Sequence, residues 1–251
     1  MPAEESTPAI VLRARDYSES DRIVTLLTRD FGKLSGIAKG AKASRKRFER
    51  KLEPFSHVIL YFRRRPHGQL VFITRAERGE SAPPTIEDDL GKIALGSYML
   101  ELAEALTTEE AEAAEAYRVL ANALEALGRA TATTGLRQAY ELRMLAAAGY
   151  GLEFGRCRLC GTAAEPEAGA VYFVVARGGI VCGRCRANAP EGAVRMAAAT
   201  AAALAHLNNA SFEEATALTP AGADGALAIA RFFASILDRK LRSVEFLDSV
   251  L

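Results

Sequence analysis

The sequence predicts an α+β protein of two domains, a five-stranded β-barrel followed by an α-helical domain that carries a four-cysteine metal module. Three observations predict this. The first 80 residues contain short β-branched and aromatic runs, the remainder is rich in alanine at helical spacing, and all four cysteines fall into two CxxC pairs. We expect residues 1–80 to form the barrel domain and residues 81–251 the helical domain.

Five strands are expected in the first domain, because each run is bounded by turn residues. Their ranges are 9–14, 23–28, 33–38, 56–62 and 70–74. A basic, helix-prone segment, 41–53, lies between the third and fourth runs. This is the element order of an OB barrel, whose curved sheet binds oligonucleotides on one face. A small β-barrel without a ligand is the alternative.

Residues 81–85 mark the change to helical sequence. Pro83 and Pro84 end the sheet, and Thr85 can cap a helix whose first turn carries Glu87 and Asp88. Apolar residues then recur at near-helical spacing. Alanine-rich segments follow at about 109–128, 134–149, 195–208 and 224–242. Alanine favours helix and allows close helix approach, so we expect the packed core of a bundle.

A strongly basic stretch lies within the barrel sequence. Residues 33–65 hold eleven basic and two acidic side chains, or +9, whereas the whole chain is +1 and the remainder therefore −8. Such asymmetry indicates a polyanion-binding surface, although a solvated positive face is the alternative. The candidate nucleic-acid-binding residues are Lys33, Lys39, Lys42, Arg45, Lys46, Arg47, Arg50 and Lys51.

Four aromatic residues could add base stacking to this charge: Tyr17, Phe48, Tyr61 and Phe62. Stacking on an exposed aromatic ring tolerates any base, because every base has a π-face. The alternative is that these rings belong to the barrel core.

The cysteines predict a structural zinc site. Cys157 and Cys160 form one pair, Cys182 and Cys185 the other, and 21 residues separate the pairs. Four thiolates close a tetrahedron around Zn²⁺ and leave no position for a catalytic water. A hairpin built from 171–175 and 180–181 would bring the pairs together within a module at about 154–190. A redox dithiol and unmetallated buried cysteines are the alternatives.

Four arginines flank these cysteines: Arg156, Arg158, Arg184 and Arg186. They either balance the negative charge of the thiolates or form a second DNA-contacting patch.

No enzyme signature is present in the sequence. The deaminase pattern lacks its His-x-Glu, and the loop at 36–43 has Ala41 and Ala43 where a P-loop needs Gly and Ser or Thr. His57 falls within a strand pattern and is interpreted as a core histidine. No run of 18 apolar residues occurs and the start is acidic, so we expect a cytoplasmic protein with no membrane segment. Without an enzyme signature, we expect no small-molecule substrate.

The chain resembles the bacterial RecO family of DNA repair proteins. The resemblance rests chiefly on residues 9–28 (AIVLRARDYSESDRIVTLLT), 31–40 (FGKLSGIAKG) and 52–55 (LEPF). It continues more weakly through 140–143 (YELR), 145–150 (LAAAGY), 157–161 (CRLCG) and 181–185 (VCGRC).

The resemblance implies an OB domain, a helical domain with a zinc module, and a non-enzymatic recombination mediator. Such a protein binds single- and double-stranded DNA, anneals complementary strands and, with RecR, helps to load RecA onto DNA coated by single-strand DNA-binding protein (SSB). An OB and zinc RNA-binding factor of translation or RNA processing is the alternative. Neither the RecR nor the SSB contact residues are assigned by the sequence.

Overall fold

A computed structural model describes residues 3–44, 47–65, 70–79, 86, 88–109, 113–164, 169–188 and 192–251. The chain forms two compact units. The first comprises residues 1–129 with 243–250, and the second comprises residues 130–242 with Leu251. The predicted domains, residues 1–80 and 81–251, stay a prediction.

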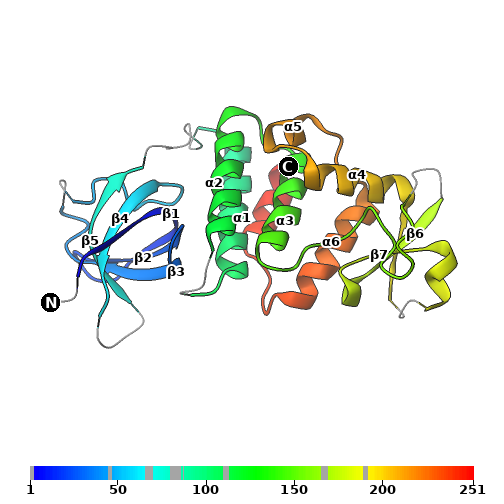
Figure 1. Cartoon of the computed structure of the whole chain (residues 1–251). Coiled ribbons are helices and arrows are strands. Elements are labelled where there is room, and N and C mark those ends of the chain that lie inside the picture. Colours follow the sequence, from blue (N-terminus) through cyan, green and yellow to red (C-terminus); the bar gives the residue numbers. More distant parts are fainter. Residues whose placement is uncertain are drawn as a thin grey trace. The chain divides into compact units, whose positions relative to one another are not determined.

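The first unit contains a closed five-stranded barrel, which confirms the predicted OB-like class (Figure 1). Its strands are β1 (Glu5–Asp16), β2 (Arg22–Thr28), β3 (Gly32–Ala38), β4 (His57–Arg63) and β5 (Val71–Arg78). They follow the order β1-β2-β3-β5-β4, and β1 closes the barrel by pairing with β4. The β3–β5 pair is parallel and the other pairs are antiparallel.

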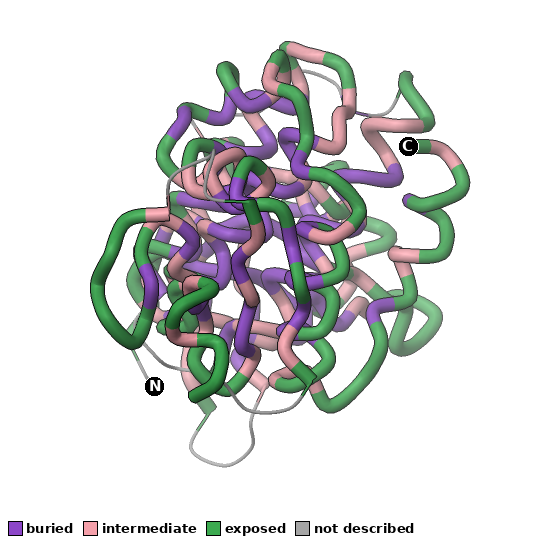
Figure 2. The backbone as a smooth tube through the Cα atoms, turned by 90° about the vertical axis from the view of Figure 1, so that its right-hand side faces the viewer, coloured by how far each residue is buried: buried purple, intermediate pink, exposed green. Residues whose placement is uncertain are grey.

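The barrel core is formed by apolar side chains that alternate along the strands. Leu60 and Phe62 of β4 are fully buried, and Val71 and Ile73 of β5 follow the same two-residue period. In Figure 2, which colours the backbone by burial, buried residues gather toward the inside and exposed ones toward the outside. A Cβ atom on Gly36 would lie only 2.7 Å from Ile73 Cγ1. Glycine at this position therefore allows β3 to approach β5 closely enough to close the barrel.

The segment between β3 and β4 is not the helix that the sequence suggested. Its described residues form turns. Phe48 and Leu52 are buried in the barrel core, while Arg50 and Phe55 adopt positive φ values of 48° and 71°. Backbone in the left-handed region ends a right-handed helix, so burial of two anchors overrides the local helix propensity.

The first unit also contains α1 (Leu90–Leu106), α2 (Ala114–Arg129) and α7 (Ser243–Val250). The carboxylate of Asp89 caps α1 by accepting from Lys92 N at 2.9 Å; Thr85, the expected cap, lies outside the described residues. Glu101 of α1 accepts from Ser243 N at 2.8 Å and from its hydroxyl at 2.7 Å. This contact attaches α7, a helix that the sequence did not indicate.

The second unit combines α3 (Thr134–Ala147), α4 (Ala198–Asn209), α5 (Phe212–Ala217) and α6 (Ala223–Ile236) with a small sheet. The sheet contains β6 (Ala170–Val174), β7 (Gly179–Cys182) and β8 (Val194–Ala197) in the order β7-β6-β8. The predicted hairpin between the cysteine pairs is confirmed. The third strand replaces the start of the expected helix at 195–208. No helix within the described ranges is long and apolar enough to cross a membrane.

Candidate metal centre and nucleic-acid interface

The four cysteines converge on one point of the second unit. Their Sγ atoms all lie within 4.8 Å of one another, and Cys160 Sγ is 3.7 Å from Cys182 Sγ. Zn–S bonds of about 2.3 Å in a tetrahedron place sulfurs about 3.8 Å apart. The cluster can therefore hold one metal ion, and its four-sulfur donor set fits zinc.

Main-chain groups orient these sulfurs. Cys157 Sγ accepts from Leu159 N at 3.5 Å and from Cys182 N at 3.3 Å, so the first knuckle is bonded to the end of β7. Gly161 follows the knuckle with φ 72°, a value that favours glycine. Each CxxC pair is thus held in place by the hairpin that separates the pairs in the sequence.

Hydrogen bonds among the thiols and with Thr162 shift their pKa values in opposite directions. A hydrogen bond with the Thr162 side chain lowers the pKa of Cys160 to about 6, whereas hydrogen bonds with Cys160 and then Cys182 raise the pKa of Cys185 to about 12. Ionisation is therefore favoured at Cys160 and opposed at Cys185. A divalent cation would favour the thiolate form of the cysteines that bind it, so metal binding and thiol ionisation support each other.

The four arginines beside the cysteines have local contacts. Arg156 donates to Gly161 O at 3.3 Å, and Arg158 donates to Gly151 O at 3.3 Å. Arg184 reaches the Thr162 hydroxyl at 3.4 Å, and the Arg186 guanidinium lies 4.5 Å from the Tyr172 ring centroid. All four are exposed residues, so these contacts leave both sequence interpretations open.

The candidate DNA-binding residues separate into groups. Lys39, Arg47 and Arg50 are exposed and Lys51 is half-buried, and no ion pair joins any of them to an acidic residue within the described ranges. Arg47 donates to Lys39 O at 3.0 Å, which links the end of β3 to the middle of the segment. The other two candidates in this segment, Arg45 and Lys46, lie outside the described residues.

Other cations of the +9 stretch lie elsewhere. Lys33 Nζ donates to Glu104 O at 2.8 Å, near the C-terminal end of α1, where a cation is favourable. Arg64 pairs with Glu5 at 3.2 Å at the start of β1. Lys42 pairs with Asp16 at the opposite end of β1, so the basic stretch does not form one continuous surface.

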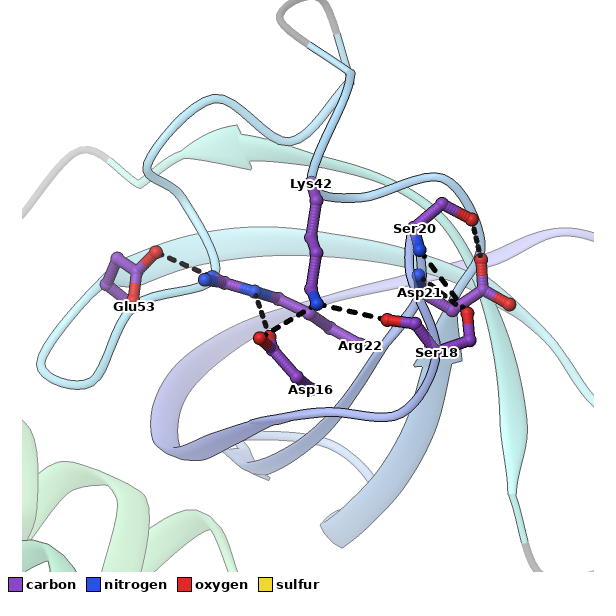
Figure 3. Close-up of polar contacts among 7 residues, drawn as sticks. All are labelled: Asp16, Ser18, Ser20, Asp21, Arg22, Lys42 and Glu53. Carbon is purple, nitrogen blue, oxygen red and sulfur yellow. Dashed lines mark hydrogen bonds and ion pairs between the residues drawn. The ribbon is translucent and has the colours of Figure 1, made fainter.

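A polar network joins the β1–β2 loop to the basic segment (Figure 3). Lys42 Nζ lies 2.8 Å from Asp16 Oδ2 and donates to Ser18 O at 3.0 Å. Arg22, at the start of β2, pairs with two carboxylates: its Nε lies 3.3 Å from Asp16 Oδ1, and its Nη1 lies 2.6 Å from Glu53 Oε1. Sequence reasoning missed this network, although Glu53, one of only two acids within the +9 stretch, was a signal that some cations would be paired internally.

Burial decides which of the four aromatic candidates could stack on a base. Phe48 and Phe62 are 3% and 0% exposed and belong to the core. Tyr61 is half-buried, and its ring centroid lies 3.3 Å from Arg75 Cζ. Its hydroxyl donates to Glu77 Oε2 at 3.0 Å. Tyr17 is 64% exposed.

The first unit contains a cavity of about 430 Å³ that Arg29, His57 and residues 114–125 line. His57 is 6% exposed, as expected for a core histidine. Arg118 is paired with Glu115 of its own helix, and Arg29 is paired with Asp30. The charged groups of this cavity are thus largely neutralised by neighbours.

Together, an OB-like barrel with a cationic segment and a four-cysteine metal site define a class of architecture used by nucleic-acid-binding proteins. Comparison with known proteins specifies the family. Residues 1–81 match the family model "Recombination protein O N terminal", and residues 87–245 match "Recombination protein O C terminal".

Curated relatives agree. The chain is 39% identical over 248 residues to "DNA repair protein RecO" of Anaeromyxobacter sp. (strain Fw109-5), with 96% of this chain and 94% of the relative covered. It is 34% identical over 246 residues to the RecO of Streptomyces avermitilis, with 95% and 96% covered. The chain belongs to the RecO family, and it is a DNA repair and recombination protein.

Proposed function

We propose that this chain is a non-enzymatic recombination mediator that binds single- and double-stranded DNA through the phosphate backbone and anneals complementary strands. With RecR it helps to load RecA onto single strands coated by SSB. It acts in the cytoplasm, at the nucleoid, and has no small-molecule substrate. The RecO family membership supports the DNA and repair parts of this proposal.

The cationic segment between β3 and β4 carries the proposal. Lys39, Arg47, Arg50 and Lys51 supply positive charge to the segment that joins β3 to β4, and none of them forms an ion pair among the described residues. Phosphate contacts by such cations release counterions, and this release supplies most of the sequence-independent affinity for DNA. Lys33 and Lys42 already have protein partners, so their assignment as direct DNA contacts stays a prediction, as does that of Arg45 and Lys46.

Annealing follows from the same electrostatics. Two single strands repel each other through their phosphates, and a cationic surface that holds both lowers this repulsion. Because phosphate contacts carry no sequence information, base pairing alone then decides which strands join.

We further propose that Cys157, Cys160, Cys182 and Cys185 hold a structural Zn²⁺. Zinc would supply a fixed tetrahedral cross-link between the two knuckles. With four protein ligands it would offer no open position for substrate, which supports a structural role over a catalytic one.

The competing function is an OB and zinc factor that binds RNA. Such a protein would use 2′-hydroxyl contacts and prefer folded RNA. The family match favours DNA, and matched DNA and RNA strands in one assay separate the two functions.

The experiment is fluorescence anisotropy with DNA and RNA single strands of the same sequence, titrated with salt. The variant Lys39→Gln/Arg50→Gln/Lys51→Gln should reduce the slope of log K against log salt by about 2, since each single-strand contact contributes about 0.7. The control Arg118→Gln/Arg129→Gln/Arg231→Gln removes three exposed cations outside the segment and should keep the slope. An unchanged slope in the first variant, or tighter binding of RNA, would contradict the proposal.

A further inference from the structure

We propose that Tyr17, in the loop between β1 and β2, stacks on an unpaired base and thereby lets the protein distinguish single-stranded DNA from duplex. This inference rests on the proposed DNA-binding function. It adds a base contact to a surface that otherwise binds phosphates.

Tyr17 is unusual among the barrel aromatics. It is 64% exposed, and the other described aromatic side chains of residues 3–79 are buried or half-buried. An exposed apolar residue by itself is ordinary. The argument therefore depends on how the loop is held and on what lies beside it.

The loop that carries Tyr17 is ordered by its own hydrogen bonds. Tyr17 N donates to Asp21 O at 3.0 Å, and Asp21 N donates to the Ser18 hydroxyl at 3.1 Å. Figure 3 shows Ser18, Ser20 and Asp21 of this loop, with Lys42 reaching toward Ser18 O. A backbone fixed before binding loses little conformational entropy when a ligand arrives, so an exposed ring on it can contribute to affinity.

The same loop is bonded directly to the cationic segment. Lys42 N donates to Ser20 O at 3.1 Å, and Gly40 N donates to Asp21 Oδ1 at 2.9 Å. Because Gly40 is bonded to Asp21, its neighbour Lys39 lies beside the loop. The Gly40 and Ser20 hydrogen bonds and, to a smaller extent, the positive charge of Lys39 lower the pKa of Asp21.

This arrangement has the two parts of a single-strand site. Cations follow the phosphates, and an aromatic ring stacks on bases without selecting among them. The loop between strands 1 and 2 is also a binding loop of OB folds in general. In a duplex the bases are already stacked and paired, so Tyr17 would contribute to binding of single strands alone.

Affinity measurements with matched single- and double-stranded DNA test the proposal. Tyr17→Ala should weaken single-strand binding by about 5- to 150-fold, the range expected for loss of one stacked base, and leave duplex binding unchanged. Tyr17→Phe keeps the ring and should restore the single-strand affinity. Because Tyr17 is exposed, the alanine variant should unfold at the same temperature as the wild type.

Tryptophan fluorescence can report base stacking directly, because the chain contains no tryptophan of its own. Tyr17→Trp introduces a single tryptophan whose fluorescence should be quenched when oligo(dT) binds. The control is Tyr150→Trp in the second unit, where the tyrosine is 43% exposed, and its fluorescence should not be quenched.

The outcomes separate this inference from the proposed function. If Tyr17→Ala weakens single-strand and duplex binding equally, or if Tyr17→Trp binds oligo(dT) by anisotropy without quenching, Tyr17 does not stack and the DNA-binding function stands. If the wild type binds no DNA in low salt, both the inference and the proposed function are wrong.

Discussion

Lys42 Nζ lies 2.8 Å from Asp16 Oδ2, so a lysine of the basic segment is paired with the last residue of β1. The hydrogen bond with Lys42 is the largest cause of the lowered pKa of Asp16. Lys42 also donates to Ser18 O at 3.0 Å. The Lys42 ammonium thus holds the β1–β2 loop against the basic segment. Lys39, in contrast, has no ion-pair partner among the described residues.

This difference predicts unequal effects of two substitutions that remove the same charge. Lys39→Met should lower the salt slope of single-strand binding by about 0.7, the contribution of one phosphate contact. Lys42→Met should lower the slope by less, because its ammonium is already paired with Asp16. It should also loosen the loop and accelerate hydrogen exchange at the amides of Gly40 and Lys42, which are bonded to Asp21 and Ser20. Equal decreases in slope would show that Lys42 contacts phosphate directly.

The fold was largely predictable because strand signals are local. β-branched runs and flanking turns predict all five barrel strands. In the structure β1, β2 and β3 extend beyond their predicted ranges, β4 is shifted by one residue, and β5 begins one residue later and ends four residues later. The cysteine cluster was predictable because two residues between the cysteines of a pair let both sulfurs point at one ion. Each strand and each CxxC pair is recognised from residues within a few positions of each other, and the predicted hairpin between the pairs brings the four cysteines together.

The parts that were missed depend on distant partners. Segment 41–53 has helix propensity, but burial of Phe48 and Leu52 in the barrel decides its conformation. β8 forms because β6 offers a free edge, with Val171 opposite Met196. Likewise, the charge of Lys42 was visible in the sequence, whereas its pairing with Asp16 follows only from the barrel.

Loss of one cysteine should destabilise the metal module. Cys157→Ser removes the buried ligand that accepts from Leu159 N and Cys182 N, so we expect loss of bound zinc and a stability decrease of more than about 4 kcal/mol. Metal analysis and hydrogen exchange of β6 and β7 measure both effects.

The control for this variant is Leu159→Ser, which changes an exposed residue between the two ligands of the first knuckle. It should retain zinc. Full zinc content in Cys157→Ser would contradict the four-cysteine site, and equal loss in both variants would show that the knuckle tolerates no substitution.

Asp224 gives the second unit a defined acid sensitivity. Burial raises its pKa, but hydrogen bonds from Ala197 N at 2.8 Å and from Thr200 at 3.1 Å outweigh this effect, and the net pKa is lowered. A lowered folded-state pKa contributes stability that is complete above the unfolded value of about 3.9 and is lost as the pH falls through the folded value.

Asp224→Asn should therefore cost about 1 kcal/mol at pH 7 and flatten the dependence of unfolding free energy on pH below about 4. Thr200→Val, which removes one of the bonds, should have a smaller effect in the same direction. Denaturant unfolding between pH 2 and 7 measures both; a variant with the wild-type acid dependence would exclude Asp224 as its source.

Gly36 should be intolerant of any side chain, because β3 and β5 meet there. An added Cβ would lie 2.7 Å from Ile73 Cγ1 and 2.9 Å from Val71 Cγ2, and Gly36 is paired with Val71 in the parallel ladder that completes the barrel. We expect Gly36→Ala to destabilise the protein by about 1–3 kcal/mol through overpacking. Gly151→Ala is the control, since a Cβ added there would meet no atom within 4 Å, and it should be neutral. Thermal unfolding compares the two, and equal stability would mean that the barrel can widen at β5 without cost.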